Sequence, residues 1–287
     1  LTEKTFYNYQ PFPSNPSVTK FFRDRYFKGN ELFLDPDIAA CGSLSANTVY
    51  TLNQSIQSNT TCFTTTGSNI ILEGNGYEIK GAFNSSGGTG FSSSTSNLNN
   101  ITIRNISILG FGAGISFTGS VFNLTIRDST INNSNNADGI TLSNSATRDV
   151  LIQNVTMRNN NDDHININGQ RVVVNNSRLF GSRVTITNNN NNFTYNTLNS
   201  STSSTAALNL NCEANTSIAY NIFGANTVDD IQIGGGCAPR GTVIEYNTFV
   251  SSSGLANGIE NGGTVGLTIR HNIFRATAND AITLPSG

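Results

Sequence analysis

A unit of about 23 residues recurs along most of this chain, and it restricts the possible folds more than any other feature of the sequence. Each copy carries two apolar positions five residues apart, such as Ile103 and Ile108, and each position recurs every 19–26 residues. Between copies lies another short segment of alternating apolar and polar residues, usually introduced by Gly or Asp. Turns rich in Asn, Gly and Ser separate these segments, which have the pattern of half-buried strands. The two columns comprise Ile103, Ile126, Ile152, Val174, Phe193, Ile218, Ile244 and Ile269, and then Ile108, Ile131, Met157, Leu179, Leu198, Phe223, Phe249 and Phe274.

Copies of such a unit cannot close hairpins in place, but each copy can pair in parallel with the copy before it. Residues 41–287 are therefore predicted to form an all-β, right-handed parallel β-helix, a solenoid of about nine or ten rungs. Asn side chains on neighbouring rungs are expected to form hydrogen-bonded ladders along the rod. Rings that share one column are expected to stack along the rod. These rings belong to Tyr195, Tyr220, Tyr246 and His271.

Residues 1–40 do not match the repeat and are rich in aromatic residues and proline. Proline and the residue before it favour extended backbone, so this segment is interpreted as an extended arm or cap. As a cap, it would fold over the first rung and cover the open edge of the solenoid. As an arm, it would leave its own body and dock on a neighbouring copy through aromatic anchors. The anchors would be Phe6, Tyr7, Tyr9, Phe12, Phe21, Phe22, Tyr26 and Phe27.

The spacing of the four cysteines indicates two disulfides, with free buried thiols as the alternative. Cys41 and Cys62 are 21 residues apart and Cys212 and Cys237 are 25 apart, so each pair would lie on neighbouring rungs. Disulfides imply an oxidising compartment, and a chain that starts with Leu1 is consistent with a removed signal peptide. We therefore expect an extracellular location or a place on a cell or virion surface. The candidate N-glycosylation sites include Asn59, Asn84, Asn123, Asn154 and Asn215.

Composition excludes several classes of partner. Charged residues make up 12% of the chain and the net charge is −2, so the basic face that a nucleic-acid binder needs is missing. No apolar run is long enough to span a bilayer. The chain has only two histidines and no closely spaced cysteine pair, so we expect no metal site. No phosphate-binding loop or nucleophile elbow occurs, and the sequence predicts no cofactor.

Acidic residues recur at one position of the segments between the copies. Carboxylates on adjacent rungs would lie about one strand spacing apart, near the ~5 Å separation found in retaining glycosidases. In such a pair one carboxyl group stays protonated and serves as the acid. The alternative is that these residues make local hydrogen bonds at the turn before each strand. His164 is expected to point outward as a solvated residue at the edge of a turn. The shared position is occupied by Asp138, Asp163, Asp229 and Asp280.

Two motifs in this region resemble those of polygalacturonases, which are glycoside hydrolases with a right-handed β-helix. Asn136-Ala137-Asp138 is similar to the family's Asn-Thr-Asp motif, and Asp162-Asp163 is similar to its Asp-Asp motif one rung later. The resemblance implies that Asp163 or Asp162 is the general acid and that Asp138 helps to activate water. It covers about thirty residues. The chain has Gly181-Ser182-Arg183 in place of the family's Gly-His-Gly, and no lysine follows Lys80 to match the family's Arg-Ile-Lys.

Residues 41–81 resemble the entry pattern of the broader right-handed parallel β-helix repeat proteins, the pectin-lyase-like group. The pattern is a strand, a Cys and then an Asn-Ile-x-Leu-x-Gly-Asn-Gly-Tyr rung. This group includes enzymes, adhesins, virion spikes and fibre subunits, so the fold does not define the function. Our first hypothesis is an extracellular structural subunit that assembles with copies of itself through residues 1–40 and the open β-helix ends. The alternatives are a hydrolase of polyuronates and a non-catalytic glycan-binding or virion-surface module.

Overall fold

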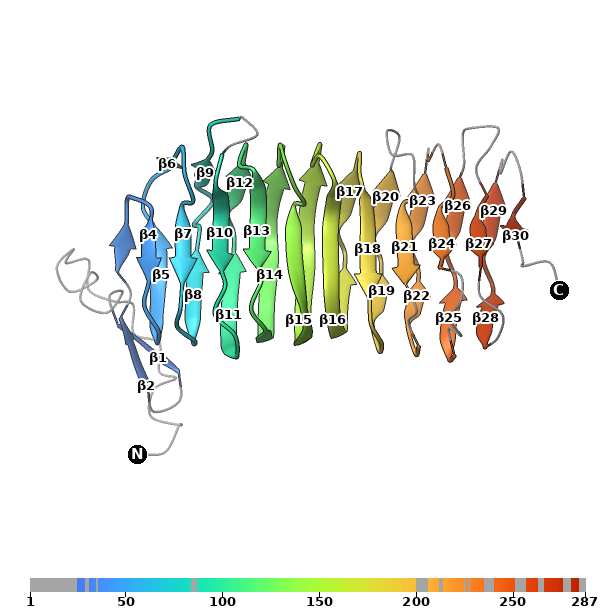
Figure 1. Cartoon of the computed structure of the whole chain (residues 1–287), viewed down its shortest axis with the longest axis horizontal. Helices are drawn as coiled ribbons and strands as arrows, with labels where there is room; N and C mark the ends of the chain where they lie inside the picture. Colours follow the sequence, from blue (N-terminus) through green and yellow to red (C-terminus); the bar gives the residue numbers. More distant parts are fainter. Residues whose placement is uncertain are drawn as a thin grey trace, which may run out of the picture.

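The structure is a computed structural model that describes residues 25–28, 31–34, 36–83, 87–199, 206–211, 214–224, 226, 228–234, 240–250, 257–262, 266–275 and 280–283. It is an all-β rod in which the strands lie side by side along the longest axis of the molecule (Figure 1). The rod is a right-handed parallel β-helix of about nine turns, which confirms the predicted fold class. In the described part of the chain there is no helix that could cross a membrane.

Each turn of the helix contributes a strand to three faces of the rod, here named face A, face B and face C. Every strand pairing of the rod is parallel and joins one rung to the next. Face A contains β4 (Gly42–Leu44), β7 (Phe63–Thr65), β10 (Thr89–Ser93), β13 (Ala113–Phe117), the first parts of β15 (Ile140–Arg158) and β16 (Asp163–Asn175), β18 (Arg183–Thr187), β21 (Leu208–Asn211), β24 (Ile231–Ile233), β27 (Ile259–Asn261) and β30 (Ile282–Thr283).

Faces B and C follow face A along each turn. Face B contains β5 (Thr48–Leu52), β8 (Ile70–Glu73), β11 (Leu98–Arg104), the first part of β14 (Val121–Asn132), the middle of β15, the second part of β16, β19 (Asn192–Thr194), β22 (Ser217–Ala219), β25 (Thr242–Glu245) and β28 (Leu267–Arg270). Face C contains β6 (Ile56–Gln57), β9 (Glu78–Lys80), β12 (Ser107–Leu109), the ends of β14 and β15, β17 (Arg178–Phe180), β20 (Thr197–Asn199), β23 (Ile222–Gly224), β26 (Thr248–Val250) and β29 (Ile273–Arg275).

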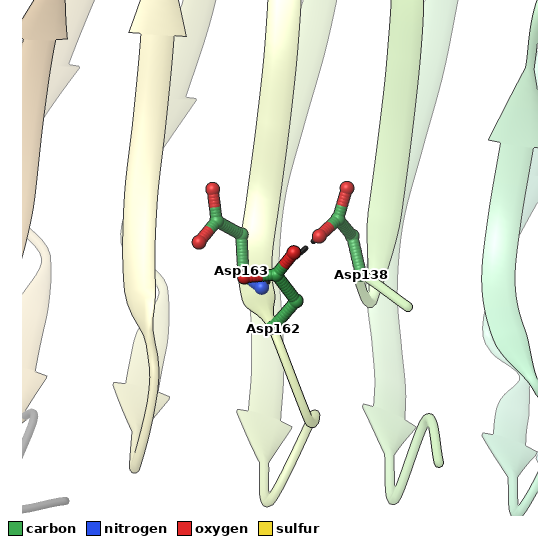
Figure 2. A group of neighbouring side chains, drawn as sticks. All are labelled: Asp138, Asp162 and Asp163. Atoms are coloured by element: carbon green, nitrogen blue, oxygen red, sulfur yellow. Dashed lines mark hydrogen bonds between the residues drawn. The ribbon is translucent and has the colours of Figure 1, made fainter. Parts of the chain in front are cut away.

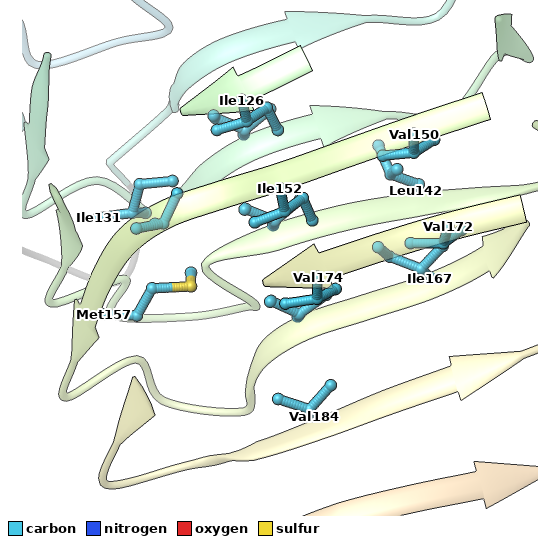
Figure 3. Close-up of a cluster of buried hydrophobic side chains, with 14 of the residues drawn as sticks. Ile126, Ile131, Leu142, Val150, Ile152, Met157, Ile167, Val172, Val174 and Val184 are labelled. Atoms are coloured by element: carbon cyan, nitrogen blue, oxygen red, sulfur yellow. The ribbon is translucent and has the colours of Figure 1, made fainter. Parts of the chain in front are cut away.

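The core is a set of apolar columns that run through the rod. Ile126 pairs with Ile152, and Ile152 pairs with Val174, as the repeat predicted. All three side chains are fully buried, and they lie over one another in Figure 3. The second column is buried in the same way at Ile131 and Met157. Alternation along each strand therefore places one side chain in the core and the next outside it.

The corner between faces B and C is a column of residues with left-handed backbone. In the earlier rungs the column holds residues that tolerate this conformation, for example Asn105 and Asn154, with φ of 52° and 51°. In the later rungs, aromatic residues occupy the same corner with φ near 57°, beginning at Tyr195. Their rings stack on one another, which confirms the expected stacking of this column.

A buried asparagine ladder follows that corner, which confirms the expectation that Asn side chains bond along the rod. The backbone N–H of Asn196 donates to Oδ1 of Asn221 at 2.8 Å, and that of Asn221 donates to Oδ1 of Asn247 at 2.9 Å. The side-chain amide of Asn221 donates to the carbonyl of Phe193 at 2.8 Å. Each amide therefore satisfies polar backbone groups that the corner would otherwise bury without partners.

The cysteines of the first rungs form the predicted bridge. Cys41 and Cys62 are joined by a disulfide and lie on adjacent rungs, 4.5 Å apart between Cα atoms. Cys212 and Cys237 lie outside the described residues, so the second bridge stays a prediction.

Part of the segment before residue 41 is described. β1 (Arg25–Lys28) and β2 (Glu31–Leu34) pair as an antiparallel hairpin. Leu34 of β2 pairs in parallel with Thr48, and β3 (Asp37–Ile38) pairs with the end of β5, so the hairpin adjoins the first rung of its own chain. Of the proposed anchors, Tyr26 and Phe27 belong to β1, and the other six lie outside the described residues. The choice between cap and arm stays a prediction.

Candidate functional site

The three carboxylates that the sequence singled out come together at the edge of face A. Asp138 precedes β15, and Asp162 and Asp163 stand at the start of β16 on the next rung (Figure 2). One oxygen from each residue lies within 4.8 Å of the others. The backbone N–H of Asp163 donates to Oδ1 of Asp138 at 3.0 Å, and the Thr141 hydroxyl donates to Oδ2 at 2.9 Å. Asp138 therefore also makes the local turn bonds that the sequence offered as the alternative.

The two aspartates of the Asp-Asp motif differ in exposure. The side chain of Asp162 is 62% exposed, whereas that of Asp163 is completely buried. Arg183 faces Asp163 across the β16–β18 pairing, and its Nε donates to Oδ1 of Asp163. The guanidinium also lies 3.4 Å from Oδ1 of Asp162. One arginine therefore joins the buried and the exposed carboxylate.

Burial controls the electrostatics of this cluster. Desolvation raises the pKa of Asp163 to about 6, although the Thr185 hydroxyl and the Arg183 guanidinium oppose the rise. Desolvation also raises the pKa of Asp138, opposed by the hydrogen bonds from the Asp163 amide and Thr141. Near neutral pH the cluster thus holds two carboxyl groups that retain protons more readily than exposed ones do.

His164 is buried, so the expectation of a solvated residue at a turn edge was wrong. The pairing of β16 with β18 shifts register between Asp163 and Ile165, and this bulge reverses the expected side of the strand. The ring nitrogens lie 3.0 Å from the side-chain nitrogen of Asn160 and 3.1 Å from the backbone nitrogen of Ser182. Burial lowers the pKa of His164 to about 4, so the imidazole is neutral at physiological pH.

The arrangement fits ligand contact better than proton delivery. A general acid must reach the oxygen of the leaving group, and buried Asp163 does not present its carboxyl group to solvent. The guanidinium of Arg183 already supplies a positive charge next to two of the three carboxylates, which is the charge that a bound cation would otherwise bring. Asp162 and the partly exposed Arg183 are the members that a ligand on the surface can touch.

A further acidic group lies on face A and was only partly apparent in the sequence. Asp230 is completely buried and accepts a hydrogen bond from Nδ2 of Asn226; burial raises its pKa to about 7, assisted by the charge of Asp229. Burial, and after it a hydrogen bond with Glu260, raise the pKa of Asp229 to about 6. Asp280, the last member of the predicted column, is exposed. The missed signal is the spacing Asn226-x-x-x-Asp230, which repeats Asn160-x-x-x-His164.

The outer side of face A is a continuous polar column that sequence reasoning did not identify. Strand register places one outward residue per rung over the next, two of them being Asn209 and Gln232. The amide of Gln232 donates to Oε2 of Glu260 at 2.9 Å, so neighbouring members bond to each other. The signal in the sequence, from Ser116 onward, was the polar residue that follows the first Ile, Val or Leu of each face A strand. The members are Ser43, Thr64, Ser92, Ser116, Thr141, Asn166, Thr185, Asn209, Gln232, Glu260 and Thr283, of which Thr185 is buried.

The described glycosylation candidates are all exposed, and three of them belong to side-chain ladders. The amide of Asn123 donates to Asn100, that of Asn154 donates to Asp128 at 2.9 Å, and that of Asn215 donates to Asn190 at 3.2 Å. Glycan attachment at these sites stays a prediction. The exposed candidates are Asn59, Asn123, Asn154 and Asn215, and Asn84 lies outside the described residues.

No protein-family model and no curated protein sequence matches this chain. Among solved structures, the chain is similar to the Dettilon tailspike protein, with 15% identity over 88% of this chain and a TM-score of 0.64. It spans 57% of that tailspike chain. It is also similar to the A-module of the Azotobacter vinelandii mannuronan C-5 epimerase AlgE6, with 13% identity, a TM-score of 0.53 and coverage of 88% of this chain and 89% of that module.

A third similar structure is the endo-xylogalacturonan hydrolase of Aspergillus tubingensis, with 13% identity, a TM-score of 0.50 and coverage of 84% of this chain and 87% of the hydrolase. These likenesses show that the chain has the right-handed parallel β-helix fold of the pectin-lyase-like proteins. At 13–15% identity they show the fold alone.

Proposed function

We propose that this chain is an extracellular, surface-located protein that binds a polysaccharide along the outer side of face A. The observation that carries the proposal is the column of hydroxyl, amide and carboxyl side chains that runs along this face. One such group occurs per rung, at a spacing of ~4.8 Å, and every member except the buried Thr185 is partly exposed, so an extended glycan meets hydrogen-bonding partners on most rungs. The names of similar structures, among them a tailspike, an epimerase acting on mannuronan and a xylogalacturonan hydrolase, support a surface or polysaccharide-related role.

The acidic cluster extends this binding face. Asp162 is exposed next to Arg183. Asn166, a member of the polar column, lies two residues after His164 on β16. A carboxylate and a guanidinium side by side offer both acceptors and donors to sugar hydroxyls. The disulfide between Cys41 and Cys62 supports the oxidising location that such a role requires.

Removing two members of the polar column should weaken glycan binding. Each hydrogen bond contributes about 0.5–1.5 kcal/mol, so the double variant Asn209→Ala/Gln232→Ala should bind about tenfold or more weakly. Titration calorimetry with the polysaccharide that the wild type binds measures the loss. Gln153→Ala is the matched control, because Gln153 points outward on face B. Equal loss in the control, or none in the double variant, would place the binding elsewhere.

A hydrolase of polyuronates is the second candidate function, and the raised pKa values of Asp138 and Asp163 favour it. Because Asp163 is buried and bound to Arg183, we expect no release of reducing ends from polygalacturonate or alginate. Release by the wild type that disappears in Asp163→Asn would instead assign the cluster to catalysis and overturn the purely binding role.

We also propose that copies of the chain assemble end to end. In the rung of β28 and β29 the core residues Leu267, Ile269 and Phe274 are only partly buried, although their column partners on the preceding rung are buried. A second copy stacked on this rung would bury their apolar surface.

Assembly should depend on the inward side of β28. Ile269→Lys places a charge among the partly buried core residues and should shift the protein to monomers in sedimentation velocity. Thr268→Lys, on the exposed outward side of the same strand, is the matched control and should assemble as the wild type does. A wild type that stays monomeric at every concentration would refute the proposal.

A further inference from the structure

Six of the eight large apolar side chains that are exposed in the described part of the chain gather on one flank of the rod. They lie at the corner between faces B and C and on face C itself, over the last four rungs. The rest of the described surface has only Phe83 and Ile282 as exposed side chains of this kind. A contiguous group of exposed apolar side chains marks an interaction site, whereas single scattered ones are normal on protein surfaces. We name it the tyrosine strip, and it comprises Tyr195, Tyr220, Tyr246, Ile222, Val250 and Ile273.

The aromatic members form a regular ladder. The rings of Tyr195 and Tyr220 are 5.0 Å apart and nearly parallel, and those of Tyr220 and Tyr246 are 5.1 Å apart. His271 continues the stack at 4.9 Å. Stacking covers the ring faces, so the ladder presents ring edges and phenolic hydroxyls at a constant interval. Tyr195, the first ring of the stack, is 61% exposed, and the preceding rung carries the shorter Asn176 at the same corner.

The backbone indicates that these rings serve more than packing. Tyr195, Tyr220 and Tyr246 have φ between 56° and 59°, in the left-handed region that bulky residues rarely adopt. Four earlier rungs fill the same column with Asn or Asp, which adopt this backbone more easily. The chain therefore combines strained backbone with exposed aromatic rings, where asparagine would avoid both. Strain that persists at a surface is a pointer to function.

The column two residues after the ladder alternates in chemistry. Strand register places Thr197, Ile222, Thr248 and Ile273 over one another, so a hydroxyl alternates with an aliphatic side chain from rung to rung. The charged neighbours of the ladder, Glu245 and Arg270, form an ion pair of 2.6 Å. The strip therefore combines apolar contact with hydroxyl groups, and its own members carry no charge, although Arg178 and Arg275 lie beside Thr197 and Val250.

We propose that the tyrosine strip binds a neutral, extended β-1,4-linked glycan that lies along the rod. The ring spacing is close to the length of one hexopyranose residue in such a chain. Each residue of the chain is turned over relative to the one before, so its polar and apolar edges alternate with the same two-rung period as the Thr/Ile column. The proposal rests on the proposed function, because it gives the polysaccharide-binding protein a second face and names the glycan class for it.

Substitution by asparagine separates binding from folding. The variant Tyr195→Asn/Tyr220→Asn/Tyr246→Asn gives the corner the residue type that earlier rungs carry, so its melting temperature should stay within a few degrees of the wild type. Its affinity for soluble xylan, glucomannan or mixed-linkage β-glucan should fall at least tenfold in affinity electrophoresis. Phe83→Asn is the matched control, since Phe83 is also exposed and left-handed, with φ of 56°, but lies outside the strip. The control should bind as the wild type does.

The outcomes distinguish this inference from the proposed function. If the triple variant keeps full affinity for neutral glycans while Asn209→Ala/Gln232→Ala loses it, the strip proposal is overturned and the proposed function stands. If the wild type binds no glycan of any class, both fail. A triple variant that melts far lower and binds normally would show that the ladder only stabilises the fold. Self-association of the wild type that the triple variant abolishes, without glycan binding, would assign the strip to a second copy and also overturn the proposal.

Discussion

Replacing Asn221 by Leu is expected to lower the free energy of unfolding by about 3 to 5 kcal/mol, because several buried polar groups lose their partners at once. The Asn221 side chain accepts from the backbone N–H of Asn196 at 2.8 Å and from its amide at 3.1 Å. It donates to the carbonyls of Phe193 and Ala219 and to Oδ1 of Asn247. Each group left unpaired in the core costs about 1–3 kcal/mol. Urea denaturation followed by circular dichroism measures the loss.

Two earlier rungs carry an aliphatic residue at this position, Ile106 and Val155, and in both cases the next rung supplies an acceptor for its N–H group. The N–H groups of Ile106 and Val155 donate to the hydroxyls of Ser129 and Ser177 on the next rung, and that of Ser177 donates to Asn196 at 2.9 Å. From Ser177 on, every rung has an acceptor at this corner, and leucine at position 221 would remove the one that the N–H of Asn196 uses. Thr194→Leu, which changes an outward residue of the preceding rung, should cost less than about 1 kcal/mol. A loss at Asn221 no larger than that would show that the ladder contributes little to stability.

The second large effect is a loss of stability as the pH rises from 5 to 8. Asp230 has a folded-state pKa of about 7, which is above its unfolded value of 3.8. The folded chain therefore holds a proton that the unfolded chain has lost, and its stabilising effect disappears as the pH rises through 7. Between pH 5 and 8 this one group accounts for about 3 kcal/mol. Asp163 and Asp229, both near 6, act in the same direction.

His164 acts in the opposite direction and reduces the net effect. Its pKa is lowered from 6.5 to about 4, so its contribution is complete above pH 6.5 and is lost as the pH falls toward 4. Above pH 5, the three carboxyl groups with raised pKa values have a larger effect on stability than the one imidazole with a lowered pKa. Thermal melts across this range should therefore show a lower midpoint at pH 8 than at pH 5.

Asp230→Asn tests the origin of this dependence. The amide has the shape of the protonated carboxyl group and carries no charge, so the variant should lose most of the destabilisation at pH 8. Asp280→Asn is the matched control, because Asp280 lies in the adjacent column, that of Asp229, but is exposed, and it should melt as the wild type does at each pH. A wild type that melts higher at pH 8, or a variant with unchanged pH dependence, would contradict the assignment.

The sequence predicted what depends on the repeat. Ile126 lies over Ile152, the Tyr195 ring stacks on Tyr220, and Cys41 bridges to Cys62. All three contacts follow from the repeat, because equivalent residues of successive turns occupy the same position along the turn. The parallel pairing and the absence of any helix in the described residues follow from the same periodicity.

What the sequence could not predict depends on local departures from the repeat. The bulge between Asp163 and Ile165 buries His164, and nothing in the residue types marks that shift of register. The predicted column correctly placed Asp138 and Asp163 side by side. It did not predict the burial of Asp163 beneath Arg183, because burial depends on the neighbouring rung rather than on the motif. The strained backbone of the tyrosine strip could be recognised only from its φ angles, although the column of tyrosines was visible in the sequence.

The most direct test of the central claim, that this rod is a glycan-binding surface, is affinity electrophoresis of the wild-type chain. The gels would contain polygalacturonate, alginate, xylan, mixed-linkage β-glucan or mannan, each compared with a gel without polysaccharide. We predict retarded migration in at least one of the glycan gels and no release of reducing ends from the same polymers. Unchanged migration in all of them would contradict the account.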